Sequence, residues 1–176
     1  SLTPKNAMAV EDKSLELNQD WRPLSFSDDG KTDAAEVVFA GYGMHVSGGD
    51  EVEEYDSYVH LDVAGKWVMV LRDMPQEITP ERRQEMARYS SPRRKATVAR
   101  DHGAKGIVFV AGPTSKVTRE LILFDSNASQ AGVSIAAVTV SNEIAKGMFQ
   151  KANKDLAKTQ ASLDDGSPQM GFPLKS

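Results

Sequence analysis

Short runs of consecutive apolar residues alternate along this chain with segments whose apolar side chains recur every three or four residues. Four runs have the length and the branched side chains of strands buried within a sheet. They lie at residues 36–40, 66–71, 107–110 and 133–140. This alternation predicts an α/β (α+β) fold, with a central β-sheet or small barrel flanked by helices, and it places the strand over 66–71 at the centre.

The clearest helix is predicted over residues 90–103, immediately before the apolar strand that follows it. A serine cap and Pro92 suit its first turn, and Gly103 suits a left-handed stop. Pro92, Ala96, Ala99 and Gly103 share one face of small side chains. We therefore expect this helix to pack closely against the sheet.

Two further helical regions follow from capping signals and periodicity. Residues 79–89 open with a threonine cap and a proline, and residues 141–152 open with a serine cap and keep helical spacing. Residues 154–163 are expected to extend the second helix to a stop at Gly166. Residues 167–176 show no strong pattern.

The length of 176 residues predicts a single domain with a substantial core. The first residue is a serine, which indicates an excised or processed piece of a longer protein. We divide it into an arm leading in from the parent chain (1–20), the domain itself (21–166) and an exit tail (167–176).

Composition narrows the classes of function. The chain is 40% hydrophobic and 26% charged, with a net charge of -4, which argues against a general nucleic-acid binder. It contains no cysteine, so disulfides, thiolate nucleophiles and cysteine-based zinc sites are excluded. No apolar run approaches the ~20 residues of a membrane span.

The strongest electrostatic feature is a basic segment with seven cations and one acid, Glu85, between residues 82 and 100. We interpret it as a solvated helix face balanced by the acidic loop at residues 50–56, with an anionic ligand or acidic partner as the alternative. The cations are Arg82, Arg83, Arg88, Arg93, Arg94, Lys95 and Arg100.

The acidic loop carries five carboxylates, whose spacing does not fit an EF-hand, so we favour a solvated loop over a Ca²⁺ site. His45 and His60 flank it and could hold a metal together with Asp56 or Asp62, although their spacing is not diagnostic. His102 is expected to cap the helix that ends before Gly103.

Catalytic motifs are absent from the sequence. Gly41-Tyr42-Gly43 lacks the third glycine and the following helix of a dinucleotide site, and no serine lies in a Gly-x-Ser-x-Gly elbow. The residues therefore supply no nucleophile, base and orienting group in a recognisable pattern. We expect no catalytic residues, no metal ligands and no cofactor in this chain.

Several passages taken in order resemble a protease-associated (PA) domain of the type inserted in secreted di-zinc aminopeptidases similar to bacterial leucyl aminopeptidase. The most specific are the Asp-Val-Ala-Gly-Lys turn with its apolar strand and the helix-to-strand passage. Ala136 stands where the family often has proline. The similar passages are residues 21–27, 38–43, 55–58, 61–72, 95–110 and 141–163.

The resemblance implies a swivelling β/β/α fold and a non-catalytic role as a substrate-access or protein-interaction module. The partners would be the peptidase domain of the parent chain and peptide or protein substrates, in a secreted or periplasmic protein. Zinc would be held only by the parent peptidase domain. The alternatives are an independent interaction or scaffold domain and, less favoured, a metal-dependent enzyme that uses His45 and His60.

Four residues are candidate contacts with a peptide or partner. Tyr42 lies in the glycine turn, Arg72 follows its strand, and Arg94 and Lys95 lie at the start of a helix. Each cation could meet a carboxylate. The alternative for Tyr42 is a place in the core, and for the cations it is a solvated surface.

Overall fold

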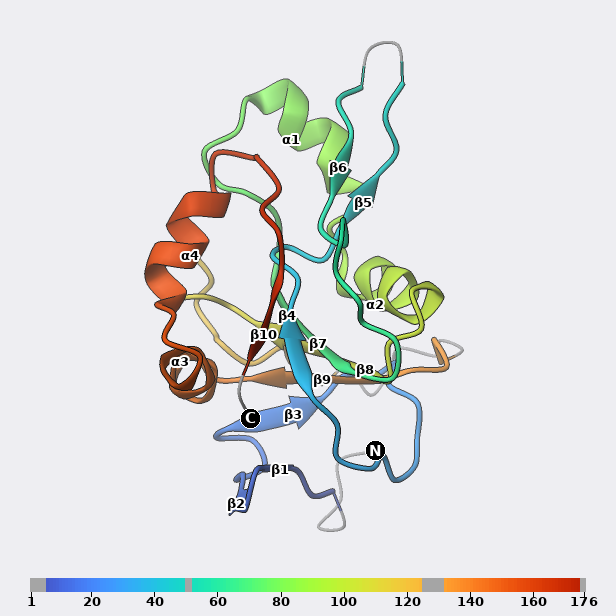
Figure 1. Cartoon of the computed structure of the whole chain (residues 1–176), viewed down its shortest axis with the longest axis vertical. Helices are drawn as coiled ribbons and strands as arrows, with labels where there is room; N and C mark the ends of the chain where they lie inside the picture. The colour runs from blue at the N-terminus through green and yellow to red at the C-terminus, as the bar shows by residue number, and fades with distance from the viewer. Residues whose placement is uncertain (1–5, 50–51, 125–131, 175–176) are drawn as a thin grey trace.

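The structure, a computed structural model, describes residues 6–49, 52–124 and 132–174 and is built around one open six-stranded sheet (Figure 1). Three parallel pairings join the inner strands β4, β7, β8 and β9. Strands β10 and β3 pair antiparallel at the two edges. In spatial order the strands are β10 (Phe172–Leu174), β4 (Val37–Phe39), β7 (Trp67–Leu71), β8 (Gly106–Val110), β9 (Ala136–Val140) and β3 (Trp21–Pro23).

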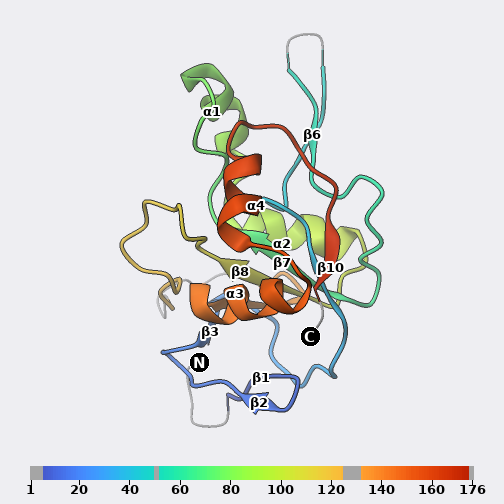
Figure 2. The same cartoon turned by 60° about the vertical axis from the view of Figure 1, so that its left-hand side comes forward.

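Helices cover both faces of this sheet (Figure 1 and Figure 2). Alternate residues of each strand point to opposite faces, so Val68 and Val70 of β7 pack with α2, while Met69 and Leu71 pack with α3 and α4. The mixed α/β architecture predicted from the sequence is confirmed. The helices are α1 (Pro80–Ala87), α2 (Pro92–Asp101), α3 (Asn142–Lys151) and α4 (Leu156–Leu163).

Two small hairpins lie outside the main sheet. Strand β1 (Ala9–Val10) pairs with β2 (Lys13–Ser14) near the N-terminus. Strand β5 (His45–Val46) pairs with β6 (Tyr55–Asp56), and this hairpin lies near α1 in the upper part of Figure 1. Asp50 and Glu51 of the predicted acidic loop lie outside the described residues.

The helix starts and stops predicted from local signals are confirmed. Thr79, Ser91 and Ser141 each accept a hydrogen bond from the backbone N–H three residues later. After α2, Gly103 has a φ of 81°, which is the left-handed conformation that glycine adopts at low cost. Strand β7 lies at the centre of the sheet, as expected.

Two predicted elements begin later than expected for a conformational reason. The strand predicted over 133–140 begins at Ala136, because Ser134 has a left-handed φ of 57° that interrupts extended backbone. The predicted extension of α3 is a separate helix, α4, since Asn153 also has a φ of 57° and Asp155 caps a new N-terminus.

The predicted exit tail contributes a strand that the apolar pattern did not reveal. In β10, Phe172 lies opposite Phe39 of β4, and Leu174 lies opposite Val37. Proline cannot donate to a strand ladder and is found on sheet edges, where it also discourages pairing with other chains. Both edge strands of this sheet contain one, Pro173 in β10 and Pro23 in β3.

Candidate functional site

The carboxyl ends of the parallel strands bring Lys95, Tyr42 and the segment after β7 together. The Lys95 side chain from α2 is fully buried, and its Nζ donates to the carbonyl oxygens of Leu71 at 2.9 Å and Asp73 at 2.6 Å. The same Nζ lies 5.6 Å from the centre of the Tyr42 ring, within the range of a cation–π contact. Lys95 therefore holds the chain where it leaves the central strand.

Burial changes the charge equilibrium of this lysine. Desolvation lowers the pKa of Lys95 to about 7, the negative charge of Asp73 opposes this change, and the positive charge of Arg72 adds to it. A side chain with no exposed surface cannot meet a peptide carboxylate in this structure. The expected role of Lys95 as a surface contact is therefore corrected to an internal role.

Tyr42 belongs to the core as well, and it is joined there by a buried carboxylate. Its hydroxyl donates to Asp164 Oδ1 at 2.5 Å, and the same carboxyl group accepts the Gln76 N–H at 3.2 Å and the Thr114 hydroxyl at 3.3 Å. Burial, and then the hydrogen bond and charge of Asp164, raise the pKa of Tyr42. This network links α4 to the turns after β4, β7 and β8.

Arg72 fastens a loop to the same edge of the sheet. One guanidinium nitrogen, Nη1, donates to the carbonyl oxygens of Arg119 at 2.9 Å and Glu120 at 3.2 Å. The Glu120 carboxylate in turn accepts the Asn142 backbone N–H at 2.8 Å, at the N-terminus of α3. Arg72 thus contacts backbone within this chain, and a contact with a peptide stays a prediction.

Arg94 does not join the other three candidates. It is exposed on α2, and its guanidinium lies 6.0 Å from the centre of the Tyr89 ring. Sequence reasoning placed Arg94 and Lys95 together because they are adjacent. Neighbouring residues on a helix point about 100° apart, so one faces solvent and the other faces the core.

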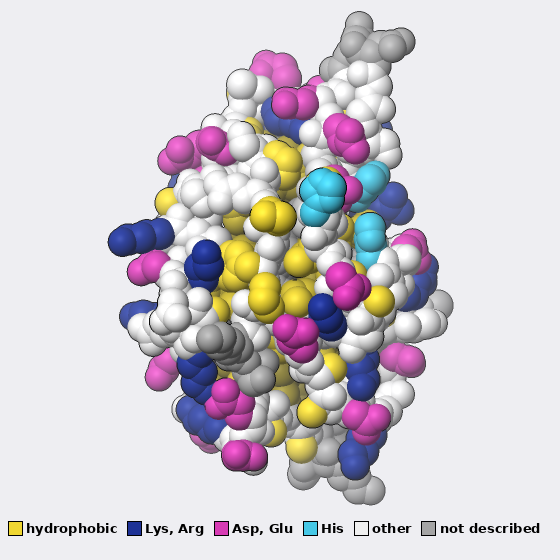
Figure 3. Space-filling model, in the orientation of Figure 1, with side chains coloured by type: hydrophobic (Ala, Val, Ile, Leu, Met, Phe, Trp, Pro, Cys, Tyr) yellow, Lys and Arg dark blue, Asp and Glu magenta, His cyan; other side chains and the backbone are white. Residues whose placement is uncertain are grey.

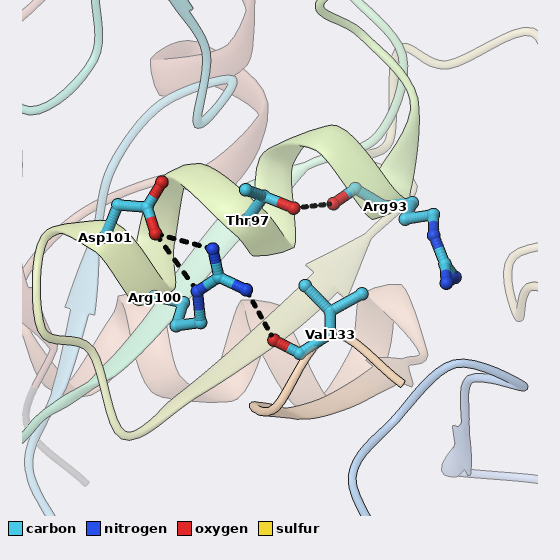
Figure 4. A network of polar contacts seen from close by, with 5 residues as sticks. All are labelled: Arg93, Thr97, Arg100, Asp101 and Val133. Carbon is cyan, nitrogen blue, oxygen red and sulfur yellow. Dashed lines mark hydrogen bonds and ion pairs between the residues drawn. The ribbon is translucent and has the colours of Figure 1, made fainter. Parts of the chain in front are cut away.

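Within the described residues, two cations of the basic segment form ion pairs with acids close to them in the sequence. Arg100 pairs with Asp101 at 2.7 Å and also donates to the Val133 carbonyl at 3.1 Å, while the Thr97 hydroxyl donates to the Arg93 carbonyl (Figure 4). On α1, Arg82 pairs with Glu85 at 3.0 Å. In the described part of the chain, no ion pair joins the basic segment to residues 52–56.

The three histidines gather on the face that Figure 3 shows, with hydrophobic side chains beside them. His45 Nδ1 lies 3.4 Å from Asp56 Oδ2, and the His102 ring stacks on Tyr58 with ring centres 4.5 Å apart. His102 is the C-cap residue of α2, as expected. Among the residues that the structure describes, no three His, Asp or Glu side chains are placed to hold one metal ion.

A pocket of about 140 Å³ lies on the surface between the turn after β6 and the segment before β10. Val59 and Met170 are 47% and 72% exposed, and each lines one side of it. Sequence reasoning missed this pocket because its two sides are more than a hundred residues apart and neither carries a motif. The lining residues are Asp56, Val59, His60, Pro168, Gln169 and Met170.

No protein-family model matches the sequence, and no curated protein matches it either. Across the described residues, none of the helices is long and apolar enough to cross a membrane. The carboxyl edge of the sheet holds an internal polar network around Asp164, and the pocket lined by Val59 and Met170 opens outward.

Proposed function

We propose that this chain is a non-catalytic protease-associated domain of a secreted or periplasmic zinc aminopeptidase. It acts as a substrate-access or protein-interaction module beside the peptidase active site. Its partners are the peptidase domain of the parent chain and peptide or protein substrates. The zinc ions belong to the parent peptidase domain.

The observation that carries this proposal is that the buried polar groups at the carboxyl edge of the sheet form their hydrogen bonds within this chain. This edge is where open α/β folds commonly bind ligands. Here Lys95 and Tyr42 are buried, and they bind backbone carbonyls and a carboxylate of the same chain. Groups engaged in this way support the structure of the domain, while the exposed apolar side chains Val59 and Met170 suit contact with another protein.

The two most specific passages of the resemblance also support the proposal. Residues 61–66 form the turn that leads into β7, where the Lys66 N–H donates to the Val63 carbonyl at 3.1 Å. Residues 95–110 form the body of α2, its glycine stop and β8. Each passage therefore coincides with one compact unit of the central sheet.

An aminopeptidase assay tests the proposal. The chain is incubated with a panel of aminoacyl chromogenic substrates, with and without added Zn²⁺, and the metal content of the same sample is measured after dialysis. We expect no turnover and no stoichiometric metal. Zinc-dependent turnover would contradict the proposal and would make His45 and His60 the first residues to substitute.

An independent interaction or scaffold domain is the second candidate, favoured by the outward pocket and the charged segments. In that case the acidic loop and the basic segment of different copies would meet. Light scattering at low and high salt separates the two candidates, because a contact between exposed charges weakens as the Debye length falls. A monomer at both salt concentrations excludes self-association.

A further inference from the structure

The pocket between the turn after β6 and the segment before β10 combines apolar walls with one carboxylate. Val59, Pro168 and Met170 supply apolar surface, and Asp56 lies among the lining residues. No Lys or Arg is among the described residues that line it. We propose that this pocket binds a lysine or arginine side chain of a partner protein, with the aliphatic stem between Val59 and Met170 and the cation at Asp56.

The hydrogen bonds of Asp56 leave one carboxylate oxygen for such a ligand. Oδ1 accepts the Tyr58 backbone N–H at 2.8 Å. Oδ2 lies 3.4 Å from His45 Nδ1, which makes an ion pair when the imidazole is protonated, and His45 Nδ1 forms no hydrogen bond within the described residues. The side chain is 16% exposed, so a cation in the pocket can reach a carboxylate that is partly shielded from water.

Both walls of the pocket are held in place by the fold, so a ligand would meet a preformed site. The Gln169 amide donates to the Ser162 carbonyl at 2.7 Å, which ties the segment before β10 to α4. On the other side, Tyr58 stacks on His102, and the Ser57 N–H donates to the Met44 carbonyl at 3.0 Å. A preformed site loses less entropy when a side chain binds.

Charge and size select a cationic side chain over the alternatives. An anionic group would be repelled by Asp56 and by the exposed carboxylates of Glu53 and Glu54 on the same hairpin. A purely apolar side chain would fill the pocket but would take water from Asp56 without replacing its interactions. Lysine and arginine supply both an apolar stem and a charged end.

A peptide titration tests the inference. The inference rests on the proposed function only in assuming that the partner is a protein. The ¹⁵N-labelled chain is titrated with acetyl-Gly-Lys-Gly-amide and, separately, with its norleucine analogue, and amide chemical shifts are followed. We expect saturable changes confined to residues 56–60 and 168–170, and an affinity for the lysine peptide at least ~5-fold above that for norleucine. Equal affinities, or changes elsewhere on the surface, would overturn the inference.

Substitutions then assign the binding to Asp56. Asp56→Asn keeps an oxygen for the Tyr58 N–H but removes the charge, and we expect ~5-fold weaker binding of the lysine peptide. Glu54→Gln removes a charge from the same hairpin outside the pocket and should change the affinity by less than ~2-fold. Equal effects of the two substitutions would show a general acidic surface and would refute a specific pocket.

A second variant covers the case in which Asp56→Asn disturbs the hairpin. Met170 is largely exposed, so Met170→Ser leaves the core intact and removes part of the wall that holds the aliphatic stem. We expect ~3-fold weaker binding of the lysine peptide, and no change with the exposed control Leu123→Ala. Unaltered affinity of Met170→Ser would contradict the inference. The aminopeptidase assay measures turnover, so its result does not depend on the outcome of these binding experiments.

Discussion

The buried ammonium of Lys95 predicts a specific dependence of stability on pH. In the folded chain its pKa is lowered to about 7 from the ordinary value of 10.5, chiefly by burial. Between these two values the unfolded chain keeps a proton that the folded chain has released. The free energy of unfolding therefore rises with pH in this window, by up to about 1.4 kcal/mol per pH unit. Below the window both states are protonated, and the folded state carries the full cost of burying the charge.

The perturbation is Lys95→Met, which keeps an unbranched side chain in the core and removes the titrating group. The free energy of unfolding is measured by urea denaturation from about pH 7 to about pH 9. Across that range we expect the wild-type value to rise, relative to the variant, by roughly 2 kcal/mol. Other groups titrate in both proteins, so the comparison isolates Lys95.

Arg94→Met is the matched control, because it removes the neighbouring cation from the exposed side of the same helix. Its stability should follow the wild-type pH dependence. At any single pH, Lys95→Met also leaves the carbonyls of Leu71 and Asp73 without their donor, at a cost of about 1–3 kcal/mol for each. The slope is therefore the decisive quantity, and parallel curves for wild type and Lys95→Met would show that Lys95 does not lose its proton in the folded chain between about pH 7 and about pH 9.

Three further substitutions are tested by the same denaturation assay. Tyr42→Phe removes the hydrogen bond to the buried Asp164 and should lower the free energy of unfolding by about 1–3 kcal/mol. Tyr58→Phe removes a buried hydroxyl that has no partner in the described residues, so it should leave the free energy of unfolding unchanged or raise it. Equal losses would contradict this role of Asp164. Gly147→Ala should raise the free energy of unfolding by about 0.5–1 kcal/mol, because Gly147 lies inside α3 and an added Cβ would meet nothing within 4 Å. A loss of stability there would show that the glycine is needed.

Signals that act over a few residues predicted most of the secondary structure. Hydroxyl caps, prolines in first turns and a glycine stop are read from neighbours in the chain, and all three predicted caps form. The wholly apolar run over 107–110, which lies within β8, indicated a strand covered on both faces, and helices do cover both faces of the sheet. The finer assignment to a protease-associated fold stays a prediction.

Elements whose formation depends on residues distant in the sequence could not be predicted from local patterns. Strand β10 has three residues, one of them a proline, and it becomes a strand because β4 offers an open edge. Tyr42 and Asp164 are 122 positions apart, so no local pattern joins them. The pocket lined by Val59 and Met170 likewise forms only when two distant segments lie side by side.

Caps and apolar periodicity act within a few residues, so local patterns were enough to predict the alternation of strands and helices and where α1, α2 and α3 begin. The apolar run over 66–71 also predicted that β7 is a buried inner strand. Tertiary structure alone decided which charges are buried. Lys95 and Arg94 are adjacent and chemically alike, but packing places one in the core and leaves the other in solvent. The physical reason is that solvation depends on what the rest of the chain places around a group.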